Sequence, residues 1–257
     1  MVLARHSLSG VLVAVKFIDK SNVENIYTNN NEKFNEVQIM EEICRGRSKH
    51  LLDLIESFED ERYYFLVTNF MPGLDLQDYI FQQDLPLRDE HTARHMLLQI
   101  CQGLQVMHNL NIVHRDIKLQ NILTLANVPL TKLKLSDFGS AFRVDENDPS
   151  KGSRFKISTP GYSAPELLKG QVQGKPIDVY AVGAVLHNIL TSQLPFFESD
   201  RDRRVARVCL QQLNTESNLL RNLTPQCKDL LSQLLEKDPE RRPTIEQVLT
   251  HEWFTLS

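Results

Sequence analysis

Apolar and polar residues alternate differently along the chain, with strand-like patterns first and helical patterns later. Val11 to Asp19 reads V-L-V-A-V-K-F-I-D, a β-branched run that predicts a strand. Leu51 to Phe58 and Tyr63 to Thr68 are two further strand-like runs, separated by E-D-E-R, which together predict a hairpin. Between these strands, helical spacing begins near Glu32 and places one apolar stripe on Val37, Met40, Ile43 and Cys44.

From Leu74 onward the periodicity is mainly helical. Leu74 to Phe81 predicts a short helix and Arg88 to Asn109 a long one. The run from Asp178 to Thr191 is almost wholly apolar, which predicts a helix buried in the middle of its domain. Asp178 stands at the start of that run, so we expect its side chain to cap the helix N-terminus.

Composition and charge narrow the class of protein. Of the 257 residues, 41% are hydrophobic and 24% are charged, which is ordinary for a globular protein. The net charge of −4 gives no basic surface for nucleic acid. The four cysteines are widely spaced, which favours reduced thiols over a zinc or disulfide framework. No apolar run approaches the ~20 residues of a membrane span. We therefore expect a cytoplasmic or nuclear protein that binds neither nucleic acid nor membrane.

A polar cluster interrupts the apolar pattern at residues 112–123, which read I-V-H-R-D-I-K-L-Q-N-I-L. Apolar pairs at both ends predict buried anchors for a polar loop that carries Asp116, Lys118 and Asn121. Asp137-Phe138-Gly139 follows sixteen residues after Asn121. This arrangement suits the positioning of a hydroxyl and a metal. The spacing H-R-D-x-K-x-x-N followed by D-F-G resembles the catalytic signature of eukaryotic-type protein kinases.

Further matches follow in the expected order along essentially the whole chain. Ala14-Val15-Lys16 resembles the V-A-I-K motif, and Ala164-Pro165-Glu166 resembles the A-P-E end of an activation segment. Lys118, two residues after Asp116, and Thr159 before Pro160 are similar to serine/threonine kinases rather than tyrosine kinases. The runs S-T-P-G-Y-S-A-P-E and H-R-D-I-K-L-Q-N look most like the calcium/calmodulin-dependent kinase group and its AMP-activated-kinase-like relatives.

The resemblance implies an α+β fold of two lobes within one kinase domain over residues 1–257. The small β-rich N-lobe would span 1–70, with its first strand missing, and the larger helical C-lobe would span 71–257. Asn69-Phe70-Met71 would form the hinge between them. Thr68 would then be a small residue that guards the pocket behind the hinge.

The resemblance also implies ATP and Mg²⁺ as cofactors, and serine or threonine hydroxyls of proteins as substrates. Asp116 would orient the attacking hydroxyl, and Lys118 would place a positive charge beside the transferred phosphate. Asn121 and Asp137 would bind Mg²⁺ through hard oxygen ligands.

The same resemblance assigns the nucleotide contacts. Lys16 would hold the α- and β-phosphates, steered by Glu36, and Glu32 one turn earlier is the alternative to Glu36. Ala14 and Leu123 would sandwich the adenine ring between them. Backbone groups of Asn69 and Met71 would contact its edge.

Three structural roles are implied as well. Asp178 would hold the backbone of the catalytic loop in addition to capping its helix. Arg242 would form a buried ion pair with Glu166. A column of apolar contacts between the lobes would comprise His114, Phe138, Met40 and Leu54.

The chain departs from the family at its N-terminus. Leu3 to His6 resembles the second kinase strand, so we expect the first strand and the glycine-rich loop to be absent. Residues 1–6 would then be a sheet edge. The loop's N–H donors would be missing from the nucleotide site. Two hypotheses therefore remain: an ATP-dependent protein kinase, and a truncated, weakly active or inactive kinase-like scaffold.

Activation and substrate choice show further departures. Arg115 would meet a phosphate on the activation segment, but the usual phosphorylated position is Phe155 here, with Ser150, Ser153 and Ser158 as nearby alternatives. Asp75 stands where basophilic relatives carry an acid that meets a substrate arginine. Gln120 replaces a second such acid. A basic run, most simply a solvated helix face, comprises Arg201, Arg203, Arg204 and Arg207.

Overall fold

The structure is a computed structural model that describes residues 1–23, 35–82, 89–126, 131–145, 147–148, 153, 159 and 161–255. Glu32, Arg88, Ser150, Phe155 and Ser158 lie outside these described residues, so the expectations attached to them are untouched by it.

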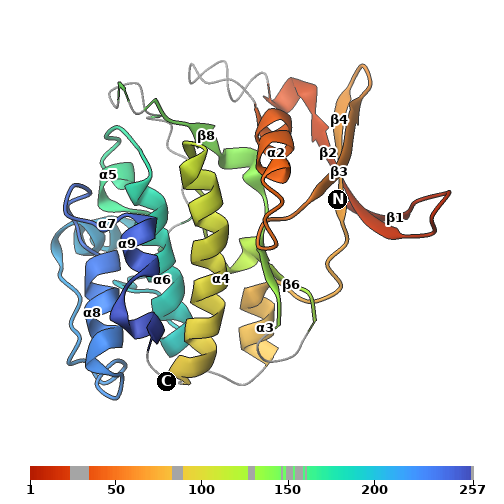
Figure 1. Cartoon of the computed structure of the whole chain (residues 1–257). Coiled ribbons are helices and arrows are strands. Elements are labelled where there is room, and N and C mark those ends of the chain that lie inside the picture. Colours follow the sequence, from red (N-terminus) through yellow and green to blue (C-terminus); the bar gives the residue numbers. More distant parts are fainter. Residues whose placement is uncertain are drawn as a thin grey trace.

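Four antiparallel strands form the sheet of the N-terminal lobe, in the order β1-β2-β4-β3 (Figure 1). They are β1 (Val2–Arg5), β2 (Leu12–Asp19), β3 (Leu54–Glu59) and β4 (Tyr63–Asn69). β1 lies at an edge of this sheet, as expected for the first residues. Side chains alternate between the two faces of a strand, so Ala14 and Lys16 project from β2 on the same side.

The predicted hairpin is confirmed, but its first strand begins at Leu54 instead of Leu51. Two of the three residues before it pair elsewhere: Leu51 forms an isolated parallel bridge with Leu135, and the Leu52 N–H donates to the Leu135 carbonyl at 2.8 Å. A strand of the C-terminal lobe therefore competes with the hairpin for this segment.

Helix α2 (Glu36–Arg45) packs beside the sheet through Ile39, Met40 and Ile43, which are all buried. Met40 and Ile43 belong to the predicted stripe, whereas Val37 and Cys44 are only half-buried. Glu36 opens the helix and is itself buried, at 3% exposure. A charged side chain buried at this level indicates a specific partner.

The C-terminal lobe is helical, with α4 at its centre in contact with α6 and α9 (Figure 1). The first predicted helices are confirmed as α3 (Leu76–Gln82) and α4 (Glu90–Asn109), the latter capped by the Asp89 side chain. Further along the described chain lie α5 (Pro165–Leu168), α6 (Pro176–Thr191), α7 (Arg201–Leu210), α8 (Pro225–Leu234), α9 (Ile245–Leu249) and the 3₁₀ helix η4 (Glu252–Thr255).

Helix α6 is buried along nearly its whole length, as its composition predicts. The expectation that Asp178 caps it is wrong. The helix starts two residues earlier, with Lys175 at the N-cap position and Pro176 in the first turn. Proline fits a first helical turn because its missing N–H has no intrahelical partner there. The Asp178 carboxylate points instead to other backbone donors.

Short strand pairs carry the polar loops between the lobes. β5 (Ile112–Val113) pairs with β8 (Phe142–Arg143), and β6 (Ile122–Thr124) pairs with β7 (Leu133–Leu135). The 3₁₀ helix η1 (Leu119–Asn121) follows Lys118 and ends with Asn121, and η2 (Phe138–Ser140) follows Asp137. The predicted anchors are confirmed at Ile112, Val113 and Ile122, which are fully buried.

The lobes share one hydrophobic core, in which Met40 of α2 and Leu135 of β7 belong to the same buried cluster. The fold is thus the expected α+β arrangement of a small antiparallel sheet and a helical lobe. Within the described part of the chain, no helix combines the length and the apolar composition needed to cross a membrane.

Candidate active site

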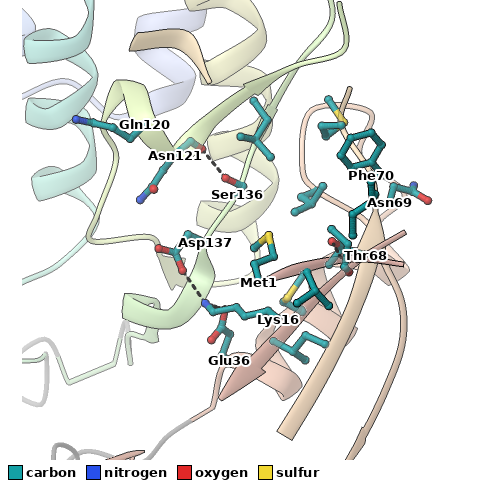
Figure 2. A pocket seen from close by; sticks show the side chains of 18 residues that line it. Met1, Lys16, Glu36, Thr68, Asn69, Phe70, Gln120, Asn121, Ser136 and Asp137 are labelled. Atoms are coloured by element: carbon teal, nitrogen blue, oxygen red, sulfur yellow. Dashed lines mark hydrogen bonds and ion pairs between the residues drawn. The ribbon is translucent and has the colours of Figure 1, made fainter. Parts of the chain in front are cut away.

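A cavity of about 560 Å³ lies where the sheet meets the helical lobe (Figure 2). Eight predicted site residues line it, namely Ala14, Lys16, Glu36, Asn69, Met71, Asn121, Leu123 and Asp137. Most of its wall is apolar, and charged groups gather where Lys16, Glu36 and Asp137 meet (Figure 2). A mostly apolar cavity with few convergent polar groups is typical of a small-molecule site.

Lys16 bridges two carboxylates. Its Nζ lies 2.7 Å from Glu36 Oε1 and 2.8 Å from Asp137 Oδ1. Burial alone would lower the pKa of Lys16, but the charges of Glu36 and Asp137 outweigh it and raise this pKa above its ordinary value. The lysine is therefore firmly cationic at neutral pH. The contact with Glu36 was expected, whereas the contact with Asp137 was not.

The two carboxyl groups respond differently to their surroundings. Burial raises the pKa of Glu36, against the opposing charge of Lys16. For Asp137 burial acts in the same direction, but the charge and hydrogen bond of Lys16 prevail and lower the pKa. Asp137 is half-exposed, at 48% of its side chain, and has a left-handed backbone with φ of 61°. It therefore stays ionised and open to the cavity.

Gly139 allows this group of charges to assemble. A Cβ at this position would lie 3.2 Å from Glu36 Oε2 and 3.5 Å from Lys16 Nζ. Any larger residue would push against the buried carboxylate and its lysine. The glycine after Phe138 thus serves close packing of the charged end of the cavity.

Asp116 is the centre of a second polar cluster. Its Oδ2 accepts hydrogen bonds from Lys118 Nζ at 2.6 Å and from Asn121 Nδ2 at 2.9 Å. Its Oδ1 accepts from the Thr159 hydroxyl at 2.8 Å, and Lys118 Nζ also donates to that hydroxyl at 3.2 Å. Asp116 and Lys118 lie outside the lining of the main cavity, and Asp116 lines a smaller second pocket. Sequence reasoning named Thr159 only as a class marker and missed its contact with Asp116.

The residues proposed to bind metal fit a magnesium ion chemically. The Asn121 amide nitrogen donates to the Asp116 backbone and side chain, which orients its oxygen as the ligand atom. Ser136, also missed from the sequence, donates both its N–H and its hydroxyl to the Asn121 carbonyl (Figure 2). Asp137 follows directly in the chain. In the described residues no group of three or more His, Cys, Asp or Glu could hold a metal ion, and Mg²⁺ is commonly bound by one or two carboxylates together with water and phosphate oxygens.

Asp178 fixes the backbone ahead of Asp116, as the resemblance implied. Its carboxylate accepts the N–H groups of His114 and Arg115, each at 2.8 Å, and it also contacts His108 Nε2 at 3.0 Å. Arg115 has a left-handed backbone with φ of 68°, which costs free energy for a residue with a side chain. The two N–H groups that donate to the buried Asp178 carboxylate stabilise that conformation.

Arg115 reaches the activation segment with its side chain. Its Nε donates to the Ser140 carbonyl at 2.7 Å, and its Nη1 donates to the Ser153 hydroxyl at 2.6 Å. Ser153 is thus the one of the three alternative serines that the structure describes, and it lies buried against this arginine.

The predicted ion pair between Arg242 and Glu166 forms bidentately, at 2.7 and 3.2 Å. The His114 and Phe138 rings lie in contact at a tilt of 55°, with centroids 5.4 Å apart. Met40 and Phe138 belong to one buried cluster, and Leu54 packs against it. The ion pair is thus confirmed, and the apolar column is confirmed at the contact of His114 with Phe138.

Residues considered for substrate choice are engaged within the protein. Asp75 Oδ1 accepts the Asp78 N–H at 2.9 Å at the start of α3, and Gln120 hydrogen-bonds Gln77. In the basic run of α7, Arg204 and Arg207 bond to backbone carbonyls, whereas Arg201 and Arg203 are exposed.

Comparison with known proteins adds independent evidence. The family model described as protein kinase domain matches residues 1–254. The SNF-related serine/threonine-protein kinase of Homo sapiens is 29% identical over 98% of this chain and 31% of its own length. Calcium/calmodulin-dependent protein kinase type II of Caenorhabditis elegans is 28% identical, over 97% and 33%. Serine/threonine-protein kinase PLK4 of Danio rerio is 30% identical, over 97% and 25%. The chain spans about a third or less of the length of these relatives.

Proposed function

Because this chain belongs to the protein kinase family, with serine/threonine kinases as its curated relatives, we propose that it transfers the γ-phosphate of ATP to serine or threonine hydroxyls of proteins. The observation that carries this proposal is a pair of charged clusters, one at an end of the cavity and one beside it. The first centres on Lys16 and Asp137, and the second centres on Asp116, whose partner Lys118 interacts electrostatically with Asp137. Asn121 lines the cavity and donates to Asp116.

In this proposal the cavity binds ATP. Ala14 and Leu123 contact the two faces of adenine, and the backbone of Asn69 and Met71 contacts its edge. Lys16, oriented by Glu36, binds the α- and β-phosphates. The lining of the cavity supports this assignment, since its apolar wall suits a base and its charged end suits phosphates.

Asp116 and Lys118 act on the transfer itself. Asp116 accepts a hydrogen bond from the attacking hydroxyl and takes its proton as the oxygen bonds to the γ-phosphorus and the bond to the β–γ bridging oxygen breaks. Lys118 stabilises the negative charge on the phosphate oxygens. The Thr159 hydroxyl already donates to Asp116 at 2.8 Å, which supports the ability of this carboxylate to hold a hydroxyl. Asn121 and Asp137 would bind Mg²⁺, which supplies compensation for phosphate charge.

An alternative is a kinase-like scaffold with little or no transfer activity. Replacement of Asp116 by Asn separates the two, since it removes the proton acceptor and keeps the shape. Transfer of radiolabel from ATP to a protein substrate should fall about 10²–10⁴-fold. Asp202→Asn, at an exposed position of α7, is the matched control. A thermal-shift titration should show stabilisation of the wild-type chain by Mg-ATP. Absence of both stabilisation and Asp116-dependent transfer would favour the scaffold.

A further inference from the structure

The segment between α2 and β3 is bonded to β7 of the helical lobe. The His50 carbonyl accepts the Leu135 N–H at 2.9 Å, and the Leu52 N–H donates back to Leu135 at 2.8 Å. Lys134 Nζ, from the same strand, donates to the Leu51 carbonyl at 2.8 Å. This short piece of the N-terminal lobe therefore moves with the helical lobe.

Asp53, at the end of that segment, connects it to the proposed hinge. Its Oδ2 accepts Lys134 Nζ at 2.8 Å and Asn69 Nδ2 at 3.0 Å, and its backbone carbonyl accepts the Asn69 N–H at 3.2 Å. Asp53 thereby binds both the side chain and the backbone N–H of Asn69. Lys134, Asp53 and Asn69 form a continuous polar connection, which we term the hinge clamp.

The hinge clamp joins elements on opposite sides of the cavity. In the β6–β7 pair Lys134 lies opposite Leu123, which lines the cavity, and Asp137 follows three residues further along the chain. Asn69 lies across the cavity from Asp137 (Figure 2). Neither Lys134 nor Asp53 lines the cavity itself, so both lie outside the site described above.

Burial of Lys134 favours a well-ordered connection. The Lys134 side chain is only 16% exposed, whereas Asp53 is 39% exposed. A half-buried ammonium with two fixed acceptors is better ordered than a surface lysine, because fewer solvent alternatives compete for its donors. Lys132, two residues earlier, is exposed and provides a comparison of equal charge.

We propose that Lys134 and Asp53 are positioning residues for the nucleobase: the hinge clamp fixes the Asn69 backbone relative to Leu123 and thereby sets the width of the adenine site. This inference rests on the proposed function only in assigning the base to this end of the cavity. Loss of the side-chain clamp leaves the hinge joined to β7 through the backbone bonds of residues 50–53, and this looser connection weakens binding of the base and leaves the transfer cluster around Asp116 unchanged.

The test is calorimetric binding of adenosine to the full chain. Lys134→Met should weaken adenosine binding about 5-fold or more, the lower end of ordinary coupling between sites, while Lys132→Met should bind as the wild type does. For ATP-dependent transfer the KM should rise and kcat should stay unchanged. A merely structural role would lower the melting temperature and leave adenosine binding intact, and that outcome overturns the inference.

Asn69→Ala provides a second variant that removes the side-chain bond of the hinge to Asp53 and keeps both the backbone bond to Asp53 and the pair of Lys134 with Asp53. It lies at an exposed side chain and should fold even where Lys134→Met does not. The double variant, with both Lys134→Met and Asn69→Ala, should bind adenosine as strongly as the more affected of the two single variants. This is expected because both substitutions act through one connection. Additive effects would refute the clamp.

A chain that binds adenosine but transfers no phosphate refutes the proposed transfer alone, and one that binds neither adenosine nor ATP refutes both proposals.

Discussion

Glu166→Gln should be among the most destabilising single substitutions in this protein. The Glu166 and Arg242 side chains are 4% and 0% exposed, and the pair is bidentate at 2.7 and 3.2 Å. Glutamine keeps the shape but turns an amide donor toward a guanidinium donor and leaves the arginine charge buried. Breaking a buried ion pair on one side costs about 3–5 kcal/mol. Arg242 keeps its bonds to the carbonyls of Glu236 and Pro176, so we expect the lower end of that range, about 3 kcal/mol.

The measurement is urea unfolding of the wild type and of Glu166→Gln at neutral pH. The unfolding free energies are compared with the same dependence on urea concentration for both proteins. Glu216→Gln is the matched control, because it makes the same chemical change in an ion pair with Lys228 whose carboxylate is 77% exposed. Exposed pairs contribute about 0–1 kcal/mol, so this variant should unfold almost as the wild type does. The reasoning fails if Glu166→Gln loses less than about 1 kcal/mol, or if both variants lose the same amount.

Three further predictions follow from the site and its surroundings. Lys16→Met removes the cation shared by Glu36 and Asp137, so kcat/KM for ATP-dependent transfer should fall about 10²-fold or more, and a loss below tenfold would contradict its role. Asp178→Asn leaves a buried backbone N–H of the catalytic loop without its acceptor and should lower the unfolding free energy by about 2–4 kcal/mol in urea, whereas unchanged stability would disprove the assignment. Burial of the Lys237 ammonium, which lies over the Phe196 ring, lowers its pKa to about 8. Since unfolding takes up a proton at Lys237 between this value and about 10.5, the unfolding free energy of the wild type relative to that of Lys237→Met should rise with pH in that window, and an unchanged difference would contradict the lowered pKa.

The motifs and the elements around them could be predicted because the chemistry requires particular residue types in a fixed order. Lys16, Glu36 and Asp137 come together from separate elements, and only the first pair was expected. The unexpected pair joins residues 121 positions apart in the sequence. No local pattern signals such a contact, because it depends on how the two lobes are placed against each other.

The prediction that Asp178 caps α6 failed for a related physical reason. Capping rules assign an acid near a helix start to the nearest unsatisfied N–H groups, which are local. Pro176 starts the helix earlier, and the catalytic loop offers two N–H donors that the carboxylate reaches from inside the first turn. The sequence pattern had assigned Asp178 to the N-cap of α6, and the resemblance had assigned it as the acceptor for the catalytic loop. The structure shows the second role and not the first.

The charged groups of both clusters already have partners within the protein. This limits the free energy that a ligand gains by contacting them. Lys16 has two carboxylate partners, and Asp116 accepts three hydrogen bonds from neighbouring side chains. A phosphate or a substrate hydroxyl that enters must exchange these contacts for its own. Charge-assisted hydrogen bonds are worth about 1.5–3 kcal/mol, so an exchange of one for another gives little net affinity. If ATP binds as proposed, the free energy of binding comes mainly from burial of the base between Ala14 and Leu123, while the charged clusters determine where the phosphates and the hydroxyl lie. This division makes the separation between the hinge and β7 important for affinity, and it explains why a connection outside the cavity should act on KM and not on kcat.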